Sequence, residues 1–196
     1  MTHPLIRQRW SPRAFAARPV EPEQLQAVFE AARWAPSSFN EQPWRFLLAT
    51  TAEPEWLAEL QGYLVEGNGW ARAAPVLVAS AYRMHFGRTG RSNRVALRDL
   101  GAAEENMFLQ AAALGLAMHQ MAGFDHERLR RTLLPPGFEP GTLIAIGYLP
   151  EAEPASGDGP LLEGVGRVRL PLAEFVFGVR WGEPAPALSL PAPVWP

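Results

Sequence analysis

The chain contains no cysteine and no lysine, so all 18 of its basic residues are arginine. Without cysteine it cannot form disulfides, iron–sulfur clusters, thiol nucleophiles or cysteine-ligated zinc sites. Without lysine it cannot use a Schiff-base lysine, and it lacks the lysine of a phosphate-binding P-loop. Any phosphate or carboxylate that the protein binds must therefore contact arginine side chains or backbone amides.

Long apolar runs are absent as well. No segment approaches the roughly 20 apolar residues that span a bilayer, and the first residues, MTHPLIRQRW, lack the apolar region of a secretory signal. We therefore expect a cytoplasmic protein that makes no membrane contact. The net charge of −2 gives no electrostatic reason to expect a nucleic-acid partner. The length of 196 residues suits one domain.

The common catalytic motifs are also missing. There is no GxSxG, GxGxxG, Walker A or HExxH sequence. His119, Asp125 and His126 are close together in the sequence, but no fourth ligand follows at a suitable spacing. We therefore expect no metal site.

Hydrophobic periodicity and the positions of proline and glycine predict alternating helices and strands. The predicted helices are a short one from Pro4 to Arg9, then Glu21 to Trp34, Glu53 to Leu64, Asn93 to Leu116 and His126 to Leu134. The predicted strands are Arg45 to Thr50, Pro75 to Tyr82, Ala117 to Met121 and Thr142 to Leu149, with a mobile polar loop from Phe86 to Asn93. This order indicates an α+β layered fold.

The C-terminal part has a different composition. Nine of the 20 prolines lie between Pro150 and Pro196, which argues against a compact helical domain there. Apolar residues such as Leu170, Phe175 and Trp181 still need a surface to cover them. We expect an extended segment whose apolar side chains pack on another surface, in particular on a second subunit.

The stretch from Pro36 to Trp44, PSSFNEQPW, lies between a predicted helix and a predicted strand. Pro36 ends the helix, and the small polar side chains that follow can bind local backbone groups or a ligand. Loops in this position often carry binding residues. An ordinary connecting loop is the alternative interpretation.

Paired arginines occur near both ends of the chain. Arg9 and Arg13 flank Ser11, and Arg167 and Arg169 stand in the sequence GRVRLPL. Two such pairs could converge on one dianion such as a phosphate monoester, which arginine forks neutralise and orient well. The alternative is that these are solvated surface arginines.

Five stretches in this order resemble the signature of the flavin-dependent nitroreductase family: RQRWSPRAF, PSSFNEQPW, MAGF at 121–124, IAIGY at 144–148 and RVRLPL at 167–172. The resemblance implies an α+β FMN-binding fold with a mixed central β-sheet flanked by helices. It also implies an obligate homodimer with active sites at the interface. Residues 1–181 would form the domain, with 150–181 as an extended arm that wraps the partner subunit and 182–196 as a proline-rich tail.

The family's site residues are carried over by their positions in these motifs. Ala122 stands where well-studied nitroreductases have a glutamate, which leaves the handling of nicotinamide and the substrate preference open. The resemblance matches Arg9, Ser11 and Arg13 to the family's N-terminal FMN motif and Arg167 and Arg169 to its C-terminal phosphate-binding pair. It gives the phosphate to Arg9, Arg167 and Arg169, and the N1 and O2 edge of the reduced flavin to Arg13. Other positions match the loop given by the other subunit (Pro36, Ser37, Ser38 and Asn40, with Gln42 in the same motif), an asparagine near the pyrimidine ring (Asn68) and the backbone contacts near flavin N5 (Ala122 and Gly123).

The function implied by the resemblance is an oxidoreductase with FMN as cofactor and NADH or NADPH as electron donor. Hydride transfer would be ping-pong, and the acceptors would be nitroaromatics, quinones or related small electrophiles. No side chain need act as a general base, which agrees with the absence of a catalytic dyad. Two alternatives stay open: specialised flavin chemistry, such as dehalogenation or flavin fragmentation, and a non-catalytic flavin-binding dimer.

Overall fold

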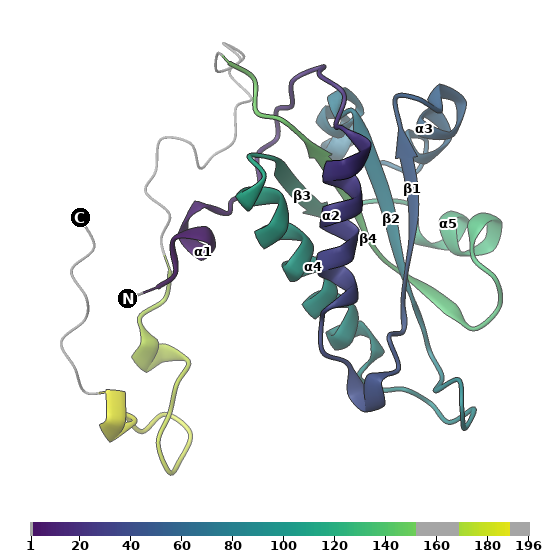
Figure 1. Ribbon diagram of the computed structural model, residues 1–196. Coiled ribbons are helices and arrows are strands. Elements are labelled where there is room, and N and C mark those ends of the chain that lie inside the picture. The colour runs from purple at the N-terminus through teal and green to yellow at the C-terminus, as the bar shows by residue number, and fades with distance from the viewer. Residues whose placement is uncertain (1, 152–168, 189–196) are drawn as a thin grey trace. The chain divides into compact units, whose positions relative to one another are not determined.

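The computed structural model describes residues 2–151 and 169–188. The chain divides into two compact units, residues 1–157 and 158–196, and each is described by itself. The larger unit contains a four-stranded sheet in the order β1 (Trp44–Thr50), β2 (Val76–Arg83), β4 (Phe138–Gly147) and β3 (Ala117–Met121) (Figure 1). Within the described residues, no helix is both long and apolar enough to cross a membrane.

The α+β architecture with helices on a central sheet is confirmed, but the strand directions differ from the expected mixed sheet. Each of the three strand pairs is antiparallel. The connection from β1 to β2 shows the reason. Two helical segments lie between these strands, whereas a single crossover helix usually joins parallel strands. The connection returns the chain to the same end of the sheet at which β1 stops, so Thr50 lies opposite Val76.

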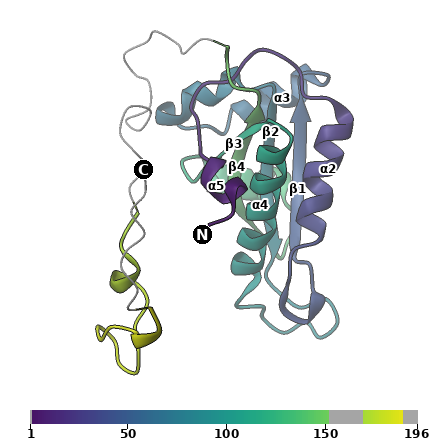
Figure 2. The ribbon, with the colours of Figure 1, turned by 60° about the vertical axis from the view of Figure 1, so that its left-hand side comes forward.

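Helices cover both faces of the sheet. α2 (Pro22–Arg33) and α4 (Ala96–Ala113) pack side by side on one face, while α3 (Pro54–Gln61) and α5 (His126–Leu133) lie on the other (Figures 1 and 2). Side chains therefore alternate between two cores along each central strand. In β2, Val76 and Val78 join the core under α2 and α4, whereas Leu77 and Ala79 join the other core.

Local sequence explains where most helices begin and end. α1 (Pro4–Gln8), α2 and α3 each begin with proline, whose fixed φ and missing N–H suit a first helical turn. The Asp125 carboxylate caps α5 by accepting from the Arg128 N–H at 3.0 Å. α4 ends before Gly115, whose φ of 73° is the left-handed conformation common after helix ends.

Several element boundaries differ from the sequence prediction, and α4 begins three residues after Asn93 and ends three residues before Leu116. The helix predicted from Glu53 to Leu64 ends at Gln61, and a 3₁₀ segment, η2 (Glu66–Ala73), follows where Gly67 and Gly69 suggested only a break. The last predicted strand begins earlier, at Phe138. It includes Pro140 because the β2–β4 register shifts between Ala79 and Ala81, next to the Pro140 pairing.

The irregularity in β4 is stabilised by Ser80. The Ser80 hydroxyl accepts a hydrogen bond from the Thr142 N–H at 2.8 Å. Gly141 directly precedes Thr142 and has no room for a side chain. A Cβ on Gly141 would lie 2.4 Å from Leu100 Cδ2 and 2.5 Å from Ser80 Oγ. The absence of a side chain at position 141 therefore lets α4 lie close to the sheet.

The described part of the smaller unit consists of turns and two short 3₁₀ segments, η3 (Leu172–Glu174) and η4 (Pro186–Leu188). The rings of Phe177 and Trp181 lie 4.8 Å apart, and Phe177 pairs with Pro184. Within residues 169–188, η3 and η4 are the only helical turns. The domain limits and the contact of this arm with a partner subunit stay predictions.

We expect Gly141→Ala to lower the free energy of unfolding by about 1–3 kcal/mol, since Leu100 and Ser80 are both buried and have little space to move. Urea unfolding of the two proteins measures this. Gly67→Ala is the matched control, because nothing lies within 4 Å of an added Cβ there, and it should change stability by less than about 0.5 kcal/mol. Equal stability of the Gly141 variant and wild type would contradict the packing described.

Candidate functional site

The segment that follows α1 carries two positive charges that no carboxylate neutralises. Arg9 Nη1 donates to Ser11 Oγ at 3.3 Å, and the Arg9 guanidinium lies 5.4 Å from the centre of the Phe108 ring. Among residues 2–151 and 169–188, neither Arg9 nor Arg13 forms an ion pair with Asp or Glu. Both charges are therefore available to an anionic ligand.

A cavity of about 170 Å³ lies beside this segment, at the C-terminal end of α4. Arg9 and Trp10 form one side of the cavity, while Phe108 and Ala112 of α4 form another. The cavity is thus bordered by Arg9 and by apolar side chains.

His119, on β3, holds the backbone of the same segment. Its Nδ1 lies 2.8 Å from the Pro12 carbonyl oxygen, and because a carbonyl can only accept, Nδ1 carries the hydrogen. Burial lowers the pKa of His119, and the nearby charge of Arg13 lowers it further, although the Pro12 carbonyl opposes both effects. The neutral imidazole therefore fixes Pro12 between Ser11 and Arg13. Sequence reasoning considered His119 only as a metal ligand and missed this contact.

Packing continues from His119 toward η2. The rings of His119 and Trp70 lie 4.6 Å apart, and Trp70 stacks on Phe15 with a centroid distance of 6.3 Å. The Ala16 N–H donates to the Tyr148 carbonyl oxygen at 2.8 Å, which attaches the end of the segment to the chain beyond β4. The two arginines thus stand on a segment that is fixed at several points.

Asn68 and Gly123, which the sequence assigned to one ligand, lie together. Asn68 Nδ2 donates to the Gly123 carbonyl oxygen at 2.8 Å. A Cβ on Gly123 would lie 2.7 Å from that nitrogen, so only glycine permits this contact. The N–H groups of Ala122 and Gly123 donate no hydrogen bond to another described residue. Asn68, Trp70, His119 and Gly123 therefore form a continuous strip that leads from the arginines to two unused backbone donors.

The loop from Pro36 to Gln42 is built by its own polar groups. Ser37 Oγ accepts from the Gln42 N–H at 3.0 Å, and Gln42 Nε2 donates to Asn40 Oδ1 at 3.1 Å. The Ser38 N–H donates to Asp99 Oδ2 at 2.9 Å, which attaches the loop to the first turns of α4. Pro36 and Asn40 are exposed.

The backbone of this loop is strained. Phe39, Asn40 and Gln42 have φ values of 53°, 55° and 49°. Residues other than glycine rarely adopt this left-handed backbone conformation. Phe39 also exposes 87% of its surface. Strained backbone and an exposed aromatic ring are more typical of a binding loop than of an ordinary connection.

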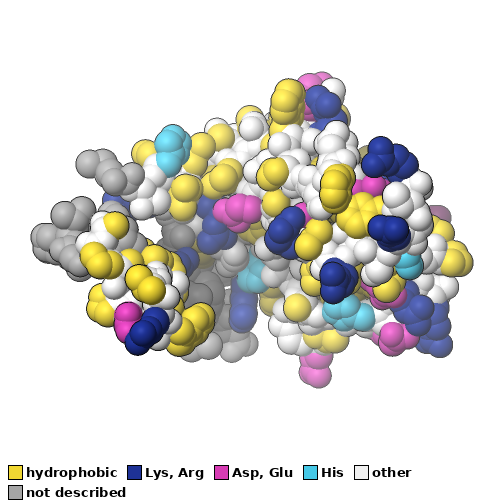
Figure 3. Space-filling model, turned by 90° about the horizontal axis from the view of Figure 1, so that it is seen from below, with side chains coloured by type: hydrophobic (Ala, Val, Ile, Leu, Met, Phe, Trp, Pro, Cys, Tyr) yellow, Lys and Arg dark blue, Asp and Glu magenta, His cyan; other side chains and the backbone are white. Residues whose placement is uncertain are grey.

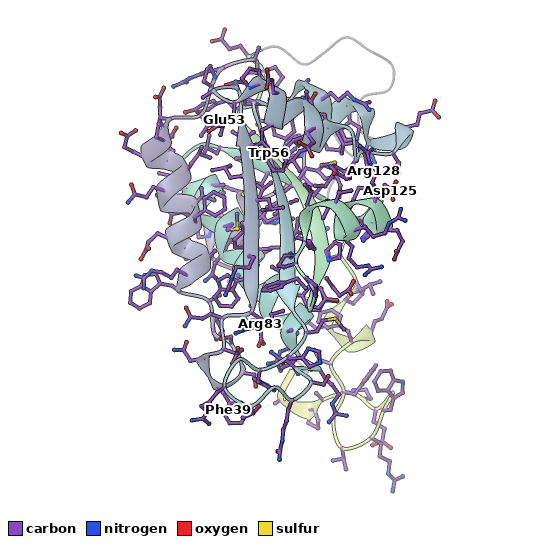
Figure 4. All side chains as sticks on the ribbon, turned by 90° about the vertical axis from the view of Figure 1, so that its right-hand side faces the viewer. Phe39, Glu53, Trp56, Arg83, Asp125 and Arg128 are labelled. Carbon is purple, nitrogen blue, oxygen red and sulfur yellow. The ribbon has the colours of Figure 1, made fainter. Side chains whose placement is uncertain are left out.

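The loop and the arginine segment lie at different ends of α4. Asp99, which holds the loop, is thirteen residues before Ala112, which borders the cavity, and this corresponds to roughly 20 Å along a helix axis. Figure 4 shows Phe39 and Arg83 at one end of the sheet, away from Asp125, which closely follows Gly123 in the chain. One copy of the larger unit therefore does not bring the two groups of predicted site residues together.

The second arginine pair cannot be placed in the site. Arg167 lies outside the described residues. Arg169 is described but belongs to the smaller unit. The convergence of both pairs on one anion stays a prediction.

Glu104 is a buried acid that the sequence did not single out. It is 3% exposed and accepts hydrogen bonds from Gln120 Nε2 and from Thr142 Oγ1, the latter at 2.8 Å. Burial raises its pKa, although hydrogen bonds from Ser80, Thr142 and Gln120 oppose the change. Glu104 thus joins α4 to both β3 and β4. Its position on a helix rich in alanine gave no signal of this role.

The raised pKa of Glu104 predicts that its contribution to stability falls as pH rises. The folded state binds the proton more tightly than the unfolded state, so this contribution is complete below the ordinary pKa of 4.5 and is lost as pH rises through the folded pKa. Glu104→Gln should remove this dependence, which cannot exceed about 1.4 kcal/mol per pH unit. Urea unfolding between about pH 5 and about pH 8 measures it. The exposed neighbour supplies the control: Glu105→Gln should keep the wild-type slope, and a Glu104→Gln slope equal to wild type would refute the assignment.

Comparison with known proteins identifies the family of the chain. The model of the nitroreductase family matches residues 6–68 and 50–148. A Rhodopseudomonas palustris protein, named as a proposed NADH dehydrogenase/NAD(P)H nitroreductase, is 32% identical over 155 residues, which cover 69% of this chain and 78% of that protein. The crystal structure of an oxidoreductase containing FMN is 34% identical, with a TM-score of 0.82 over 93% of this chain and 94% of the other. A nitroreductase family protein from Clostridium difficile is 26% identical, with a TM-score of 0.69 over 92% and 99% of the two chains. The chain therefore belongs to the nitroreductase family, a family of oxidoreductase enzymes.

Proposed function

We propose that the protein is an FMN-dependent oxidoreductase that takes electrons from NADH or NADPH and reduces small electrophilic acceptors such as nitroaromatics and quinones. The similar structure that contains FMN and the relatives with NAD(P)H nitroreductase names support this proposal. The observation that carries it is the strip itself, with two unneutralised arginines at one end and two unused backbone N–H groups at the other. A cytoplasmic location stays a prediction.

The donor groups along the strip suit the parts of FMN. Arg9, Ser11 and Arg13 offer charged and neutral donors to a phosphate, and arginine is well suited to this because its fork can contact two oxygens. Asn68 and the backbone of Ala122 and Gly123 offer donors to the polar edge of a planar ring. In the proposed site, Arg167 and Arg169 complete the phosphate contacts.

Bound FMN would supply the redox chemistry, accepting a hydride from the nicotinamide and passing electrons to the acceptor. The residues of this chain bind and orient it. Arg13 places a positive charge near the site, which favours the negatively charged reduced form of a flavin. Ala122 brings no titratable side chain, so the backbone donors there do not change with pH. The donor and the acceptor would use the same site in turn.

The position of the Pro36–Gln42 loop supports a homodimer. The loop is roughly 20 Å along α4 from the residues that border the arginine segment, yet its backbone strain and exposed polar groups are those of a binding loop. A second copy can supply this loop to the site of the first. We therefore propose that Ser37, Ser38, Asn40 and Gln42 act on the FMN of the partner subunit.

The purified protein is expected to show the visible spectrum of FMN, which bleaches when NADH or NADPH is added without oxygen. Arg9→Ala with Arg13→Ala should weaken FMN binding about tenfold or more, because each charged hydrogen bond to phosphate contributes about 1.5–3 kcal/mol. Flavin fluorescence quenching measures the affinity. Arg131→Ala, on α5, is the control and should bind as wild type does. A colourless protein that takes up no added FMN would refute the proposed function.

His119 is expected to position the phosphate-binding segment. His119→Phe keeps an aromatic ring beside Trp70 but removes the donor to Pro12, so FMN affinity should fall by a factor of about three to ten. His119→Asn keeps an N–H near Nδ1 and should restore most of that affinity. The turnover at saturating FMN should be similar in all three proteins. If His119→Phe keeps the wild-type affinity while His119→Asn loses it, His119 has only a packing role.

A further inference from the structure

Positive charge is concentrated next to the Pro36–Gln42 loop. Residues 83–99 contain five arginines and a single acidic residue, although the whole chain has a net charge of −2. Figure 3 looks at this end of the larger unit from below and shows dark blue basic side chains spread among yellow hydrophobic ones. The segment therefore forms a basic surface on a protein that is slightly acidic overall.

Two of these arginines are neutralised and three are not. Arg83 pairs with Glu41, and Arg98 pairs with Asp99 at 2.9 Å. Arg88, Arg91 and Arg94 are exposed, and within the part of the chain that the structure describes they form no ion pair. Three guanidinium groups within seven residues repel one another, and a bound anionic ligand would reduce this repulsion.

Residues 84–93, which we call the arginine turn, form a hydrogen-bonded turn that includes the predicted polar loop from Phe86 to Asn93. His85 pairs with Ser92, and the Asn93 N–H donates to the Met84 carbonyl oxygen at 2.7 Å. Gly90, with a φ of 66°, donates to the Phe86 carbonyl oxygen at 2.8 Å. The backbone that carries Arg88 and Arg91 is therefore well defined.

The arginine turn is attached to the Pro36–Gln42 loop. Glu41 Oε1 accepts from the Gly87 N–H at 2.7 Å and also binds Arg83. The rings of Phe39 and Phe86 meet edge to face, with their centres 5.8 Å apart. Wherever the loop is placed in the assembled protein, the arginine turn is placed with it.

Donors without acceptors gather at the same place. Among the described residues, three buried side-chain nitrogens have no hydrogen-bond partner: Trp70 Nε1, Arg83 Nε and Asn93 Nδ2. Two of them belong here, because Arg83 directly precedes the arginine turn and Asn93 ends it. Buried donors are normally paired, and an ordered water or ion commonly satisfies those that protein groups do not. An excess of donors together with three free cations is the composition of an anion-binding surface.

We infer that Arg88, Arg91 and Arg94 bind the 2′-phosphate of NADPH and make NADPH the preferred electron donor. The inference rests on the proposed function, in which the Pro36–Gln42 loop lies beside the FMN of the partner subunit. NADH and NADPH differ only in this dianionic group, which is far from the nicotinamide. Because the nicotinamide must meet the flavin, the 2′-phosphate lies at the rim of the site, where exposed arginines on a turn can reach it.

The test compares kcat/KM for NADPH and NADH in the FMN-loaded protein and in a variant with Arg88→Gln, Arg91→Gln and Arg94→Gln. Wild type should prefer NADPH at least tenfold. The triple variant should lose most of that preference, with its kcat/KM for NADH changed by less than threefold. The NADPH advantage of wild type should also fall with added salt, because exposed charges are screened. Arg131→Gln is the control and should keep the preference.

A second measurement needs no variant. Adenosine 2′,5′-bisphosphate should compete with NADH at least tenfold more strongly than adenosine 5′-phosphate does, since only the former has the 2′-phosphate. Equal competition by the two nucleotides, or a wild-type enzyme that uses NADH as well as NADPH, would overturn the inference. So would a triple variant that loses activity only toward an anionic acceptor while it keeps the NADPH preference.

The experiments give different results when this inference is wrong and when the proposed function is wrong. If the protein binds FMN and oxidises NADH but does not favour NADPH, the arginine turn has been misassigned and the proposed function stands. If the protein neither binds FMN nor oxidises either nucleotide, the proposed function itself is wrong.

Discussion

Burial of the central strands on both faces is the constraint on which the rest of the structure depends. β2 and β4 contribute alternate side chains to two separate cores, one under α2 and α4 and the other under α3 and α5. Neither strand can shift by one residue without exchanging the two sets of side chains. The register of the sheet therefore fixes β3 and the backbone that follows it, and through β3 it fixes His119, Ala122 and Gly123.

α4 determines how the candidate site residues are distributed. Its first turns hold the Pro36–Gln42 loop through Asp99, its middle reaches the sheet through Glu104, and its last turns border the arginine segment. A single helix thus separates two groups of residues that the proposed FMN site needs together. In the proposed dimer, the helix length sets how far the loop of one subunit must reach to the other.

The strongly periodic elements and the order of the motifs were predictable from the sequence. α2 was expected from the spacing of Leu25, Val28 and Ala32, and β3 was expected within its observed limits. Contacts between distant residues were not predictable, because nothing local encodes them. The bond from His119 to Pro12 joins residues 107 positions apart, and Glu104 acquires its partners only when α4 packs on the sheet. The same holds for the early start of β4, which depends on the Ser80 hydroxyl.

The contact between Asn68 and Gly123 has a consequence for how such a site can diversify. A Cβ at position 123 would lie 2.7 Å from Asn68 Nδ2, so a side chain there would displace the Asn68 amide from its hydrogen bond to Gly123. Ala122 is different, since its side chain is exposed and its backbone supplies the donor whatever residue stands there. Substitutions at position 122 therefore change the side chain offered to the proposed site and leave this contact intact, whereas substitutions at position 123 disturb it.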